Sequence, residues 1–395
     1  MQAGRVVTIT LDNVAFLKSA AGEALLERLA AADLSEGNVL RLVTTLRKTY
    51  PPELVRAGVE MAQLRQRAVD KFGADAGRML FTREALEQAS DPLVRRYRAE
   101  VVGRCKLVDA CCGIGTDAVA FAQGGAQVIG IDLEPVRVAM AAHNAEVSGA
   151  AARFEIGDVR GELPASDVVF FDPARRDADG KRIHDVERYL PPLSVIEGWA
   201  GREVIVKLSP GVELESVERY GGMVEFISVS GELKEAVLWR GGRHRGRQAT
   251  LLMGNHVLHW QTERVTAAEA ARLGEPHGWL IEPDPALLRA GLVTDVVERF
   301  EGWMLDPTIA YFTTDDVPDS MWLRGWRVLD WMPFNVKRLR AYLRERDVGR
   351  VTVKKRGSPV TPESLIPQLK LKGSGAVAVV LTRLRGDPIV IICEE

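Results

Sequence analysis

The chain has 395 residues, 46% of them hydrophobic and 27% charged, which is typical of a globular protein with two or three domains. Its formal net charge of -2 at pH 7 indicates neither an acidic nor a basic partner, and no apolar run approaches the ~20 residues of a membrane span. The first residues, MQAGRVVTITLDN, lack the apolar core of a signal peptide, so we expect a cytoplasmic protein. The four cysteines have the spacing of neither a disulfide framework nor, with histidines, a zinc site, so we expect no metal.

Residues 1–100 are expected to form a helical domain. Apolar residues recur at helical spacing within residues 15–50. Pro51 and the proline after it predict the start of another helix, which Gly73 can end. Thr82 is a candidate N-cap for the helix that follows.

The next segment, residues 101–262, carries the pattern of an open α/β sheet. Between residues 106 and 176 the order is strand, glycine turn, helix, strand ending in an acid, helix, strand, strand. The apolar strands predict a parallel sheet covered on both faces, which is a Rossmann-like α/β fold. Further strands are expected over residues 202–209 and 225–255, with an arginine-rich hairpin tip at residues 240–247. Ligands bind such sheets beyond the carboxyl ends of the strands, where the strand order reverses.

Polar residues stand at the strand ends where a nucleoside would bind. Gly113 and Gly115 let the backbone approach a ligand closely, and the helix that begins near Thr116 presents its free N–H groups there. Asp132 ends the second strand about twenty residues later, the usual distance for a carboxylate on ribose hydroxyls, and Asp158 is expected to meet an adenine amino group. The predicted cofactor-binding residues are Asp109, Cys111, Gly113, Gly115, Thr116, Asp117, Asp132, Leu133, Asp158 and Val159.

Two cofactors compete for this pattern. The spacing of Gly113, Gly115 and Ala118 loosely fits the fingerprint of a nicotinamide dinucleotide. However, Asp109 at the end of the first strand would repel a pyrophosphate, whereas it would attract the ammonium group of S-adenosylmethionine. The Asp-Pro pair that begins at Asp172 is also not required for hydride transfer. We therefore predict S-adenosylmethionine as the cofactor.

These segments also carry a family resemblance. LVDACCGIGTDAVAFA (107–122), VIGIDLEPVRVAMAAHNAEVSG (128–149) and DVVFFDP (167–173) resemble the class I methyltransferase core of trimethylguanosine synthase and its bacterial relatives. FFDPARR together with the C-terminal KKRG is similar to bacterial methyltransferases with a THUMP-like C-terminal domain. The resemblance implies S-adenosylmethionine as the donor, a methyltransferase sheet and an RNA substrate, but it does not supply a nucleotide.

The turn Asp172-Pro173-Ala174-Arg175 follows the fourth strand, where amino-group methyltransferases hold the acceptor. We expect Asp172 and the Pro173 carbonyl to accept hydrogen bonds from the acceptor nitrogen. Arg175 stands where trimethylguanosine synthase-type enzymes have a stacking aromatic residue, which argues against a guanine cap as the substrate. Arg175 and Arg176 are expected either to contact a base or phosphate or to pair with neighbouring acids such as Asp177 or Glu187.

A carbon-5 pyrimidine mechanism is the alternative for a turn of this kind. It would need a cysteine nucleophile near the fifth strand. That strand ends in Lys207-Leu208-Ser209-Pro210 and has no cysteine nearby, so the mechanism is disfavoured. Lys207 faces the same edge of the sheet and is a candidate substrate-binding residue.

Residues 270–395 are expected to form a THUMP-like α+β domain that could bind RNA. It contains a predicted helix at 286–300, strands and a basic helix. Between Arg324 and Arg385 there are fifteen Lys/Arg and four Asp/Glu, which is typical of a nucleic-acid-binding surface and also of a solvated face. The remaining predicted substrate-binding residues are Arg243 and Arg245 of the hairpin tip and Lys354, Lys355 and Arg356 of this domain.

Three functional hypotheses follow. The first is an S-adenosylmethionine-dependent methyltransferase that modifies a base nitrogen in RNA, with tRNA and rRNA not distinguished. The second is an S-adenosylmethionine-binding RNA-binding or assembly protein without turnover. The third is a methyltransferase acting on a small molecule or a protein.

Overall fold

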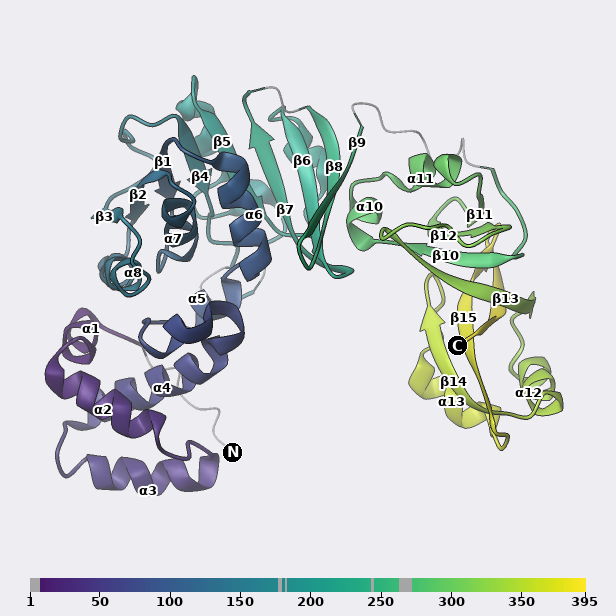
Figure 1. Ribbon diagram of the computed structural model, residues 1–395, viewed down its shortest axis with the longest axis horizontal. Coiled ribbons are helices and arrows are strands. Elements are labelled where there is room, and N and C mark those ends of the chain that lie inside the picture. The colour runs from purple at the N-terminus through teal and green to yellow at the C-terminus, as the bar shows by residue number, and fades with distance from the viewer. Residues whose placement is uncertain (1–7, 177–179, 182, 243–244, 263–271) are drawn as a thin grey trace. The chain divides into compact units, whose positions relative to one another are not determined.

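The computed structural model describes residues 8–176, 180–181, 183–242, 245–262 and 272–395 (Figure 1). The chain divides into two compact units. The first comprises Met1–Val224 and Lys234–His244, and the second comprises Glu225–Leu233 and Arg245–Glu395. Among the described helices, none combines the length and the apolar character that crossing a bilayer requires.

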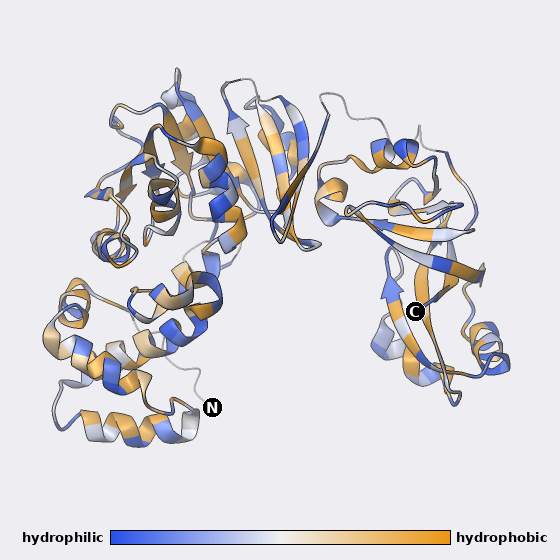
Figure 2. Ribbon diagram, viewed as in Figure 1, coloured by the Kyte–Doolittle hydropathy of each residue, from blue (hydrophilic) through white to orange (hydrophobic). Residues whose placement is uncertain are grey.

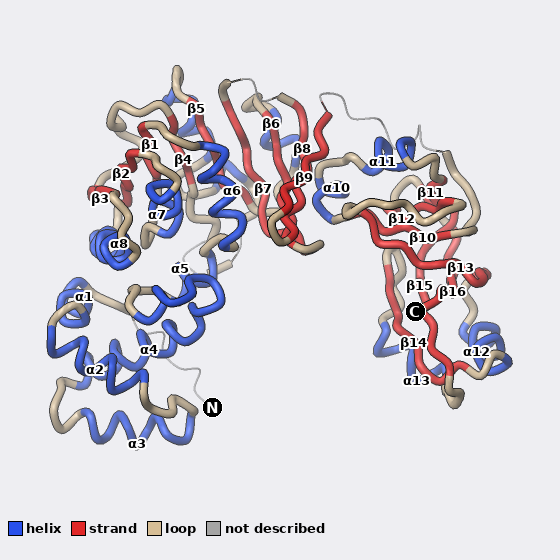
Figure 3. The backbone as a smooth tube through the Cα atoms, in the orientation of Figure 1, coloured by secondary structure: helices blue, strands red, loops and turns tan. Residues whose placement is uncertain are grey.

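The first unit begins with helices, as predicted (Figure 3). Pro52 opens the long helix α4, and Gly73, with a φ of 55°, follows its last residue, so the predicted start and end are confirmed. Thr82 caps α5 by accepting a hydrogen bond from the Ala85 N–H at 3.1 Å, also as predicted. The helices are α1 (Leu11–Leu17), α2 (Ala20–Ala30), α3 (Glu36–Leu46), α4 (Pro52–Phe72), the 3-10 helix η1 (Gly73–Gly77), α5 (Arg83–Gln88) and α6 (Pro92–Val102).

The sheet of the first unit has the predicted parallel strands. Its order is β3-β2-β1-β4-β5, and β7 runs antiparallel beside β5. The chain builds the sheet from β1 to β3 and then from β4 to β5, so the strand order reverses between β1 and β4. The elements are β1 (Lys106–Ala110), α7 (Thr116–Gln123), β2 (Gln127–Asp132), α8 (Pro135–Val147), β3 (Ala152–Ile156), β4 (Val168–Phe171), η2 (Val186–Arg188), η3 (Leu193–Trp199), β5 (Glu203–Leu208), α9 (Leu214–Glu218) and β7 (Glu232–Arg240).

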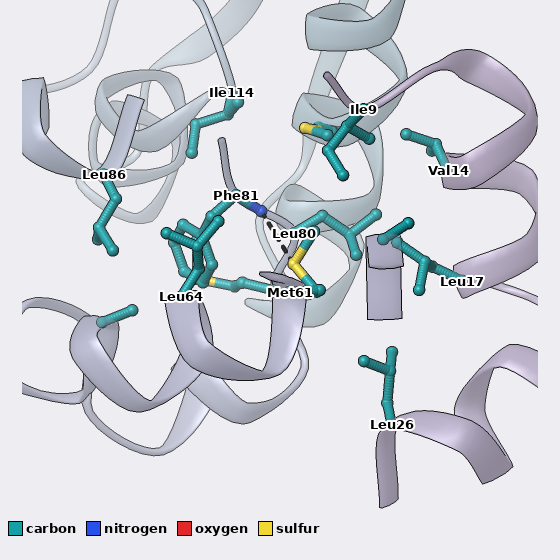
Figure 4. Close-up of a cluster of buried hydrophobic side chains, with 14 of the residues drawn as sticks. Ile9, Val14, Leu17, Leu26, Met61, Leu64, Leu80, Phe81, Leu86 and Ile114 are labelled. Carbon is teal, nitrogen blue, oxygen red and sulfur yellow. Dashed lines mark hydrogen bonds between the residues drawn. The ribbon is translucent and has the colours of Figure 1, made fainter. Parts of the chain in front are cut away.

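The central strands of this sheet lie in the core, whereas its edge does not. The residues of β4 are all buried, but those of β3 are exposed or half-buried, because β3 is the edge strand. Figure 2 shows the apolar character of the central strands in orange. A second cluster joins the N-terminal helices to the glycine turn, because Met61, Leu64 and Phe81 pack with Ile114 (Figure 4), and it includes Met140 of α8. The helical segment therefore shares a core with the glycine turn.

The second unit contains the predicted α+β segment. Its seven-stranded sheet has the order β11-β12-β10-β13-β16-β15-β14, in which β14 and β15 are parallel. The elements from β8 onwards are β8 (Gly246–Met253), β9 (His256–Thr262), β10 (Trp279–Pro283), α10 (Pro285–Arg289), α11 (Val293–Arg299), β11 (Trp303–Asp306), β12 (Ile309–Thr314), β13 (Leu323–Pro333), α12 (Val336–Glu345), β14 (Val348–Lys355), α13 (Pro362–Leu369), β15 (Gly375–Leu384) and β16 (Asp387–Glu394). Strand β6 (Met223–Val229) is shared between the two units.

Two predicted elements were wrong. The helix expected over residues 286–300 is two short helices, α10 and α11, because Gly291 between them has a φ of 72°, which interrupts a helix. The hairpin predicted with its tip at residues 240–247 is wrong, because β7 and β8 are not neighbours: β7 pairs with β5, whereas β8 lies between β6 and β9.

Candidate active site

A cavity of about 450 Å³ opens beyond the carboxyl ends of β1, β2 and β4, where the strand order reverses. Eight of the ten predicted cofactor-binding residues line it, the exceptions being Gly115 and Asp158. Asp172 and Lys207 line the same cavity. The rest of its wall includes residues of α5 and the turn after it, and residues 190–192.

The glycine turn contains three residues with positive φ. Cys111, Gly113 and Gly115 have φ values of 66°, 54° and 78°, in the left-handed region that favours glycine. The Gly113 N–H donates to Asp132 Oδ2 at 2.9 Å, which fixes the turn against the end of β2. The other carboxylate oxygen of Asp132 accepts from the Glu134 N–H at 3.0 Å. Asp132 is therefore held rigidly in the cavity wall.

Gly115 serves packing rather than ligand contact. A Cβ at this position would lie 2.9 Å from Ala141 Cβ and 3.1 Å from Phe154 Cε1. Gly115 is also the N-cap of α7 and has no side chain to bond the first N–H groups of that helix. Gly115 therefore allows close approach of α8 and β3 rather than of a ligand, and the adjacent Thr116 lines the cavity.

Asp109 is the most unusual carboxylate of the cavity. It is 1% exposed, and neither of its oxygens has a hydrogen-bond partner among the described residues. Burial raises the pKa of this carboxyl well above its usual value, and the neighbouring carboxylates of Asp117 and Asp172 raise it further. A buried carboxylate without a partner is costly unless a ligand supplies one. An ammonium group, as in S-adenosylmethionine, fits this requirement.

Asp172 and Lys207 form an ion pair in the same cavity. Asp172 directly follows β4, and its Oδ2 atom accepts from Lys207 Nζ at 2.7 Å. Lys207, near the end of β5, also donates to the Gln88 carbonyl at 3.2 Å. Arg175 Nη2 lies 4.0 Å from Asp172 Oδ1, so Arg175 pairs with a nearby acid, and its contact with a base or phosphate stays a prediction. The sequence predicted these residues individually but not their pairing.

A buried charge network lies behind this pair and was missed by sequence reasoning. Arg98 of α6 is fully buried and pairs with both Asp117 and Glu235. Burial alone would raise the pKa of the Asp117 carboxyl, but the positive charges of Arg98 and Lys207 outweigh it and hold the pKa below its usual value. The only sequence signal was an arginine on the inward face of a predicted helix, which does not indicate partners so distant in the chain.

The side chain of Asp158 lies outside the cavity. It pairs with Arg160, with Nη2 and Oδ2 2.6 Å apart, and the hydrogen bond from the Arg160 side chain lowers the pKa of this carboxyl to about 2. Its neighbours Gly157 and Val159 line the cavity instead. The predicted contact between the Asp158 carboxylate and an adenine amino group therefore does not fit this arrangement.

A segment hydrogen-bonded to the Asp172 turn supplies an apolar wall. Ala174 and Leu190 exchange two backbone hydrogen bonds of 2.9 and 3.0 Å, which tie residues 190–192 to the turn. Leu190 and the two prolines after it line the cavity. Arg176 donates to the Gly180 carbonyl at 2.9 Å and, like Pro173 and Arg175, does not line the cavity. Position 175 has an arginine where trimethylguanosine synthase-type enzymes have a stacking aromatic residue. The apolar surface in this cavity comes instead from residues 190–192.

The predicted substrate-binding cations of the second unit differ in their availability. Lys354 and Arg356 share Glu282 as a partner, at 3.6 and 3.2 Å, whereas Lys355 is exposed. The Arg245 carbonyl accepts from the Gln261 side chain at 3.4 Å.

Arg243 lies outside the described residues. The same is true of Asp177, one of the acids proposed to pair with Arg175 and Arg176, and the other, Glu187, pairs with Arg219 at 2.7 Å. In the part of the chain that the structure describes, no group of three or more His, Cys, Asp or Glu side chains could hold a metal ion.

Comparison with known proteins agrees with this geometry. Residues 104–168 match the RNA cap guanine-N2 methyltransferase family, residues 323–395 match the THUMP domain-like family, and residues 10–68 match a domain of unknown function. A crystal structure from Porphyromonas gingivalis, of a protein proposed to be a methyltransferase, has a TM-score of 0.72 at 18% identity and covers 91% of this chain and 98% of its own. That likeness supports the fold.

Relatives of known sequence carry the comparison further. An uncharacterized RNA methyltransferase of Halalkalibacterium halodurans is 33% identical over 89 residues, 20% of this chain and 19% of its own. Uncharacterized S-adenosylmethionine-dependent methyltransferases from two strains of Mycobacterium tuberculosis are 37% identical over 338 residues, which are 82% of this chain and 92% of theirs. Since this similarity extends over most of both chains, the protein belongs to the family of S-adenosylmethionine-dependent methyltransferases.

Proposed function

We propose that this methyltransferase acts on a base nitrogen in RNA and that Asp172 orients the acceptor. The observation that carries the proposal is the placement of Asp109 and Asp172 at the ends of the adjacent strands β1 and β4, facing one cavity. The THUMP domain-like match, the RNA methyltransferase names of shorter matches and the basic segment between Arg324 and Arg385 favour RNA as the substrate.

The donor end of the cavity has the groups that S-adenosylmethionine needs. When bound, S-adenosylmethionine supplies an electrophilic methyl group on a positively charged sulfur. Asp109 would neutralise its ammonium group, which would give the buried carboxylate the partner it lacks. Asp132, already oriented by the N–H groups of Gly113 and Glu134, would accept hydrogen bonds from ribose hydroxyls. The positive φ values of the glycine turn allow its backbone to come close to the ligand.

The acceptor end has to align a nucleophile with the methyl group, because methyl transfer is an in-line displacement. The Asp172 side chain is 23% exposed and would accept a hydrogen bond from the N–H of the acceptor. The Pro173 carbonyl remains the predicted second acceptor. A paired base would have to be flipped out or presented single-stranded to reach this depth.

We expect cations of the second unit to bind the phosphate backbone of the RNA. Lys354 and Arg356 share the charge of Glu282, so their contribution is partly neutralised. Lys337, Arg338 and Arg344 on α12 are exposed and have no ion-pair partner among the described residues. We therefore expect α12, together with Lys355, to contribute most of the phosphate contacts.

Transfer of labelled methyl groups tests this function. RNA from cells that lack the gene is incubated with the protein and tritiated S-adenosylmethionine, in parallel with protein and small-molecule fractions. We expect label in RNA, loss of at least ~100-fold in rate for Asp172→Asn, and unchanged binding of S-adenosylhomocysteine by calorimetry. Asp319→Asn, in an exposed loop of the second unit, is the control for the chemical change.

Each other outcome has a definite meaning. Binding of S-adenosylhomocysteine without transfer to any fraction would support the RNA-binding or assembly protein instead. Label confined to small molecules or protein would exclude RNA as the acceptor. Full activity of Asp172→Asn would remove the role assigned to that carboxylate.

A further inference from the structure

Lys207 has one N–H group that no described residue accepts. Its Nζ atom donates to Asp172 Oδ2 at 2.7 Å and to the Gln88 carbonyl at 3.2 Å. An ammonium group has three N–H donors, so one remains without a hydrogen-bond partner among the described residues. Lys207 is 3% exposed and lines the cavity, which makes that donor available to a ligand there.

The ammonium group of Lys207 is also held in place by Asp117 and the buried charges bound to it. Asp117 Oδ2 lies 3.9 Å from Lys207 Nζ, and Asp117 is itself bound to the fully buried Arg98. Arg98 in turn pairs with Glu235 on β7. A charge constrained in this way keeps its position while a ligand reacts, which is the condition for electrostatic stabilisation of a developing charge.

We propose that the acceptor is the N–H nitrogen of a lactam ring, N1 of guanine or N3 of uracil, and that Lys207 stabilises the negative charge that forms on its carbonyl oxygen. This inference rests on the proposed function, because it assumes a base in RNA. It selects a ring nitrogen, whereas the family that residues 104–168 match is named for the exocyclic N2 of guanine.

The sign of the charge that develops on the acceptor distinguishes a lactam nitrogen from an exocyclic amino nitrogen. A lactam nitrogen becomes nucleophilic by losing its proton, and the resulting negative charge is shared with the adjacent oxygen. An exocyclic amino group instead gains positive charge as it attacks. A fixed ammonium group beside the acceptor stabilises the first course and opposes the second. The free donor of Lys207 next to Asp172 therefore favours a lactam.

The pair of Asp172 and Lys207 also accounts for removal of the proton from the ring nitrogen. The ring N–H transfers its proton to the Asp172 carboxylate, and the positive charge of Lys207, released from that carboxylate, then faces the lactam anion. The nitrogen lone pair forms the new bond to the methyl carbon. The carbon–sulfur bond breaks with its electrons remaining on sulfur, so that an anion and a sulfonium become two neutral products. Asp172 afterwards returns its proton to solvent.

The walls of the cavity suit a flat ring at this position. Leu190, Pro191 and Pro192 form an apolar surface that the Ala174 backbone holds beside the Asp172 turn. An apolar wall of this kind can pack on the face of a base without hydrogen bonding to it. Recognition of the ring edge is then left to Asp172 and Lys207.

The identity of the methylated nucleoside tests the inference without any variant. RNA labelled by the wild-type protein is digested to nucleosides and analysed by mass spectrometry. We expect 1-methylguanosine or 3-methyluridine. N2-methylguanosine, N6-methyladenosine or N4-methylcytidine would overturn the inference while leaving the proposed function intact. RNA that takes up no label would count against the proposed function and the inference together.

A second experiment tests Lys207 itself. For Lys207→Met we expect the transfer rate at pH 7 to fall by ~100- to 1000-fold, with S-adenosylhomocysteine affinity retained as evidence of folding. The lost activity should be partly restored as the pH rises, because solvent then removes the lactam proton. Lys106→Met, at the amino end of β1 and outside the cavity wall, should leave transfer unchanged. A Lys207→Met protein that binds S-adenosylhomocysteine and transfers at the wild-type rate would contradict the proposal.

Discussion

Replacement of Arg98 by methionine is expected to destabilise the first unit strongly. Arg98 is fully buried, and its partners Asp117 and Glu235 have side chains that are only 9% and 5% exposed. Methionine fills a similar volume but leaves the buried Glu235 carboxylate without its counter-charge and leaves Asp117 with only the more distant Lys207, 3.9 Å away. Breaking a buried pair in this way costs about 3–5 kcal/mol, because the remaining charge is desolvated and unpaired.

Urea denaturation measures this cost, with Arg96→Met as the matched control. Arg96 lies on the same helix and also forms a salt bridge, with Glu100 at 2.7 Å, but its side chain is 71% exposed. An exposed pair of this kind contributes about 0.5 kcal/mol or less. The two variants therefore separate the effect of burial from the effect of losing an arginine.

Two further results would decide whether charge is the cause. The triple variant Arg98→Met, Asp117→Asn, Glu235→Gln should recover most of the loss, because no unpaired charge remains. The pKa of Asp117 is lowered in the folded protein, so its ion pairs contribute stability above the ordinary value of 3.8, and this contribution is lost as the pH falls through the folded pKa. The deficit of Arg98→Met should therefore shrink in acid. A deficit below ~1 kcal/mol at pH 7 would refute the reasoning.

The remaining predictions concern the glycine turn and its carboxylate. Asp109→Asn should weaken S-adenosylhomocysteine binding by ~10- to 100-fold yet raise the free energy of unfolding of the ligand-free protein. Because the pKa of Asp109 is raised in the folded protein, the wild type should be less stable than this variant by an amount that grows as the pH rises above 3.8. Urea denaturation at several pH values measures this difference, and a difference that shrinks as the pH rises would contradict the prediction. Gly115→Ala should destabilise the protein by at least ~1 kcal/mol, because its φ is 78° and its Cβ would crowd Ala141, whereas Gly37→Ala, in helix α3 with open space around it, should stabilise by ~0.5 kcal/mol in thermal melts.

Local patterns explain why so much of the first unit was predictable. Alternating and helical periodicities identified β1, α7, β2 and α8, and proline and glycine marked the ends of α4. Since the carboxyl ends of parallel strands meet at one edge of a sheet, the acids at the carboxyl ends of β1, β2 and β4 were expected to converge. The cavity lined by Asp109, Asp132 and Asp172 agrees with that expectation.

Side-chain direction was less predictable than position. Asp158 follows β3 as expected, but Arg160, only two residues away, turns its carboxylate out of the cavity wall. The long helix expected over residues 286–300 was wrong because Gly291, with a φ of 72°, interrupts it. In both cases the sequence allows two local arrangements: the Asp158 carboxylate can point into or out of the cavity, and the chain can continue or break the helix at Gly291. A pattern of residue types does not decide between them.

The amino-acid sequence by itself determined the α/β fold, the glycine turn, the acids at the strand ends and the membership of a methyltransferase family. Only the tertiary structure decided that Lys207 pairs with Asp172, 35 residues away, and that Arg98 reaches Glu235, 137 residues away. The physical reason is that strand ends and turns follow from short-range periodicity. The partners of a buried charge depend instead on which distant strands and helices pack side by side.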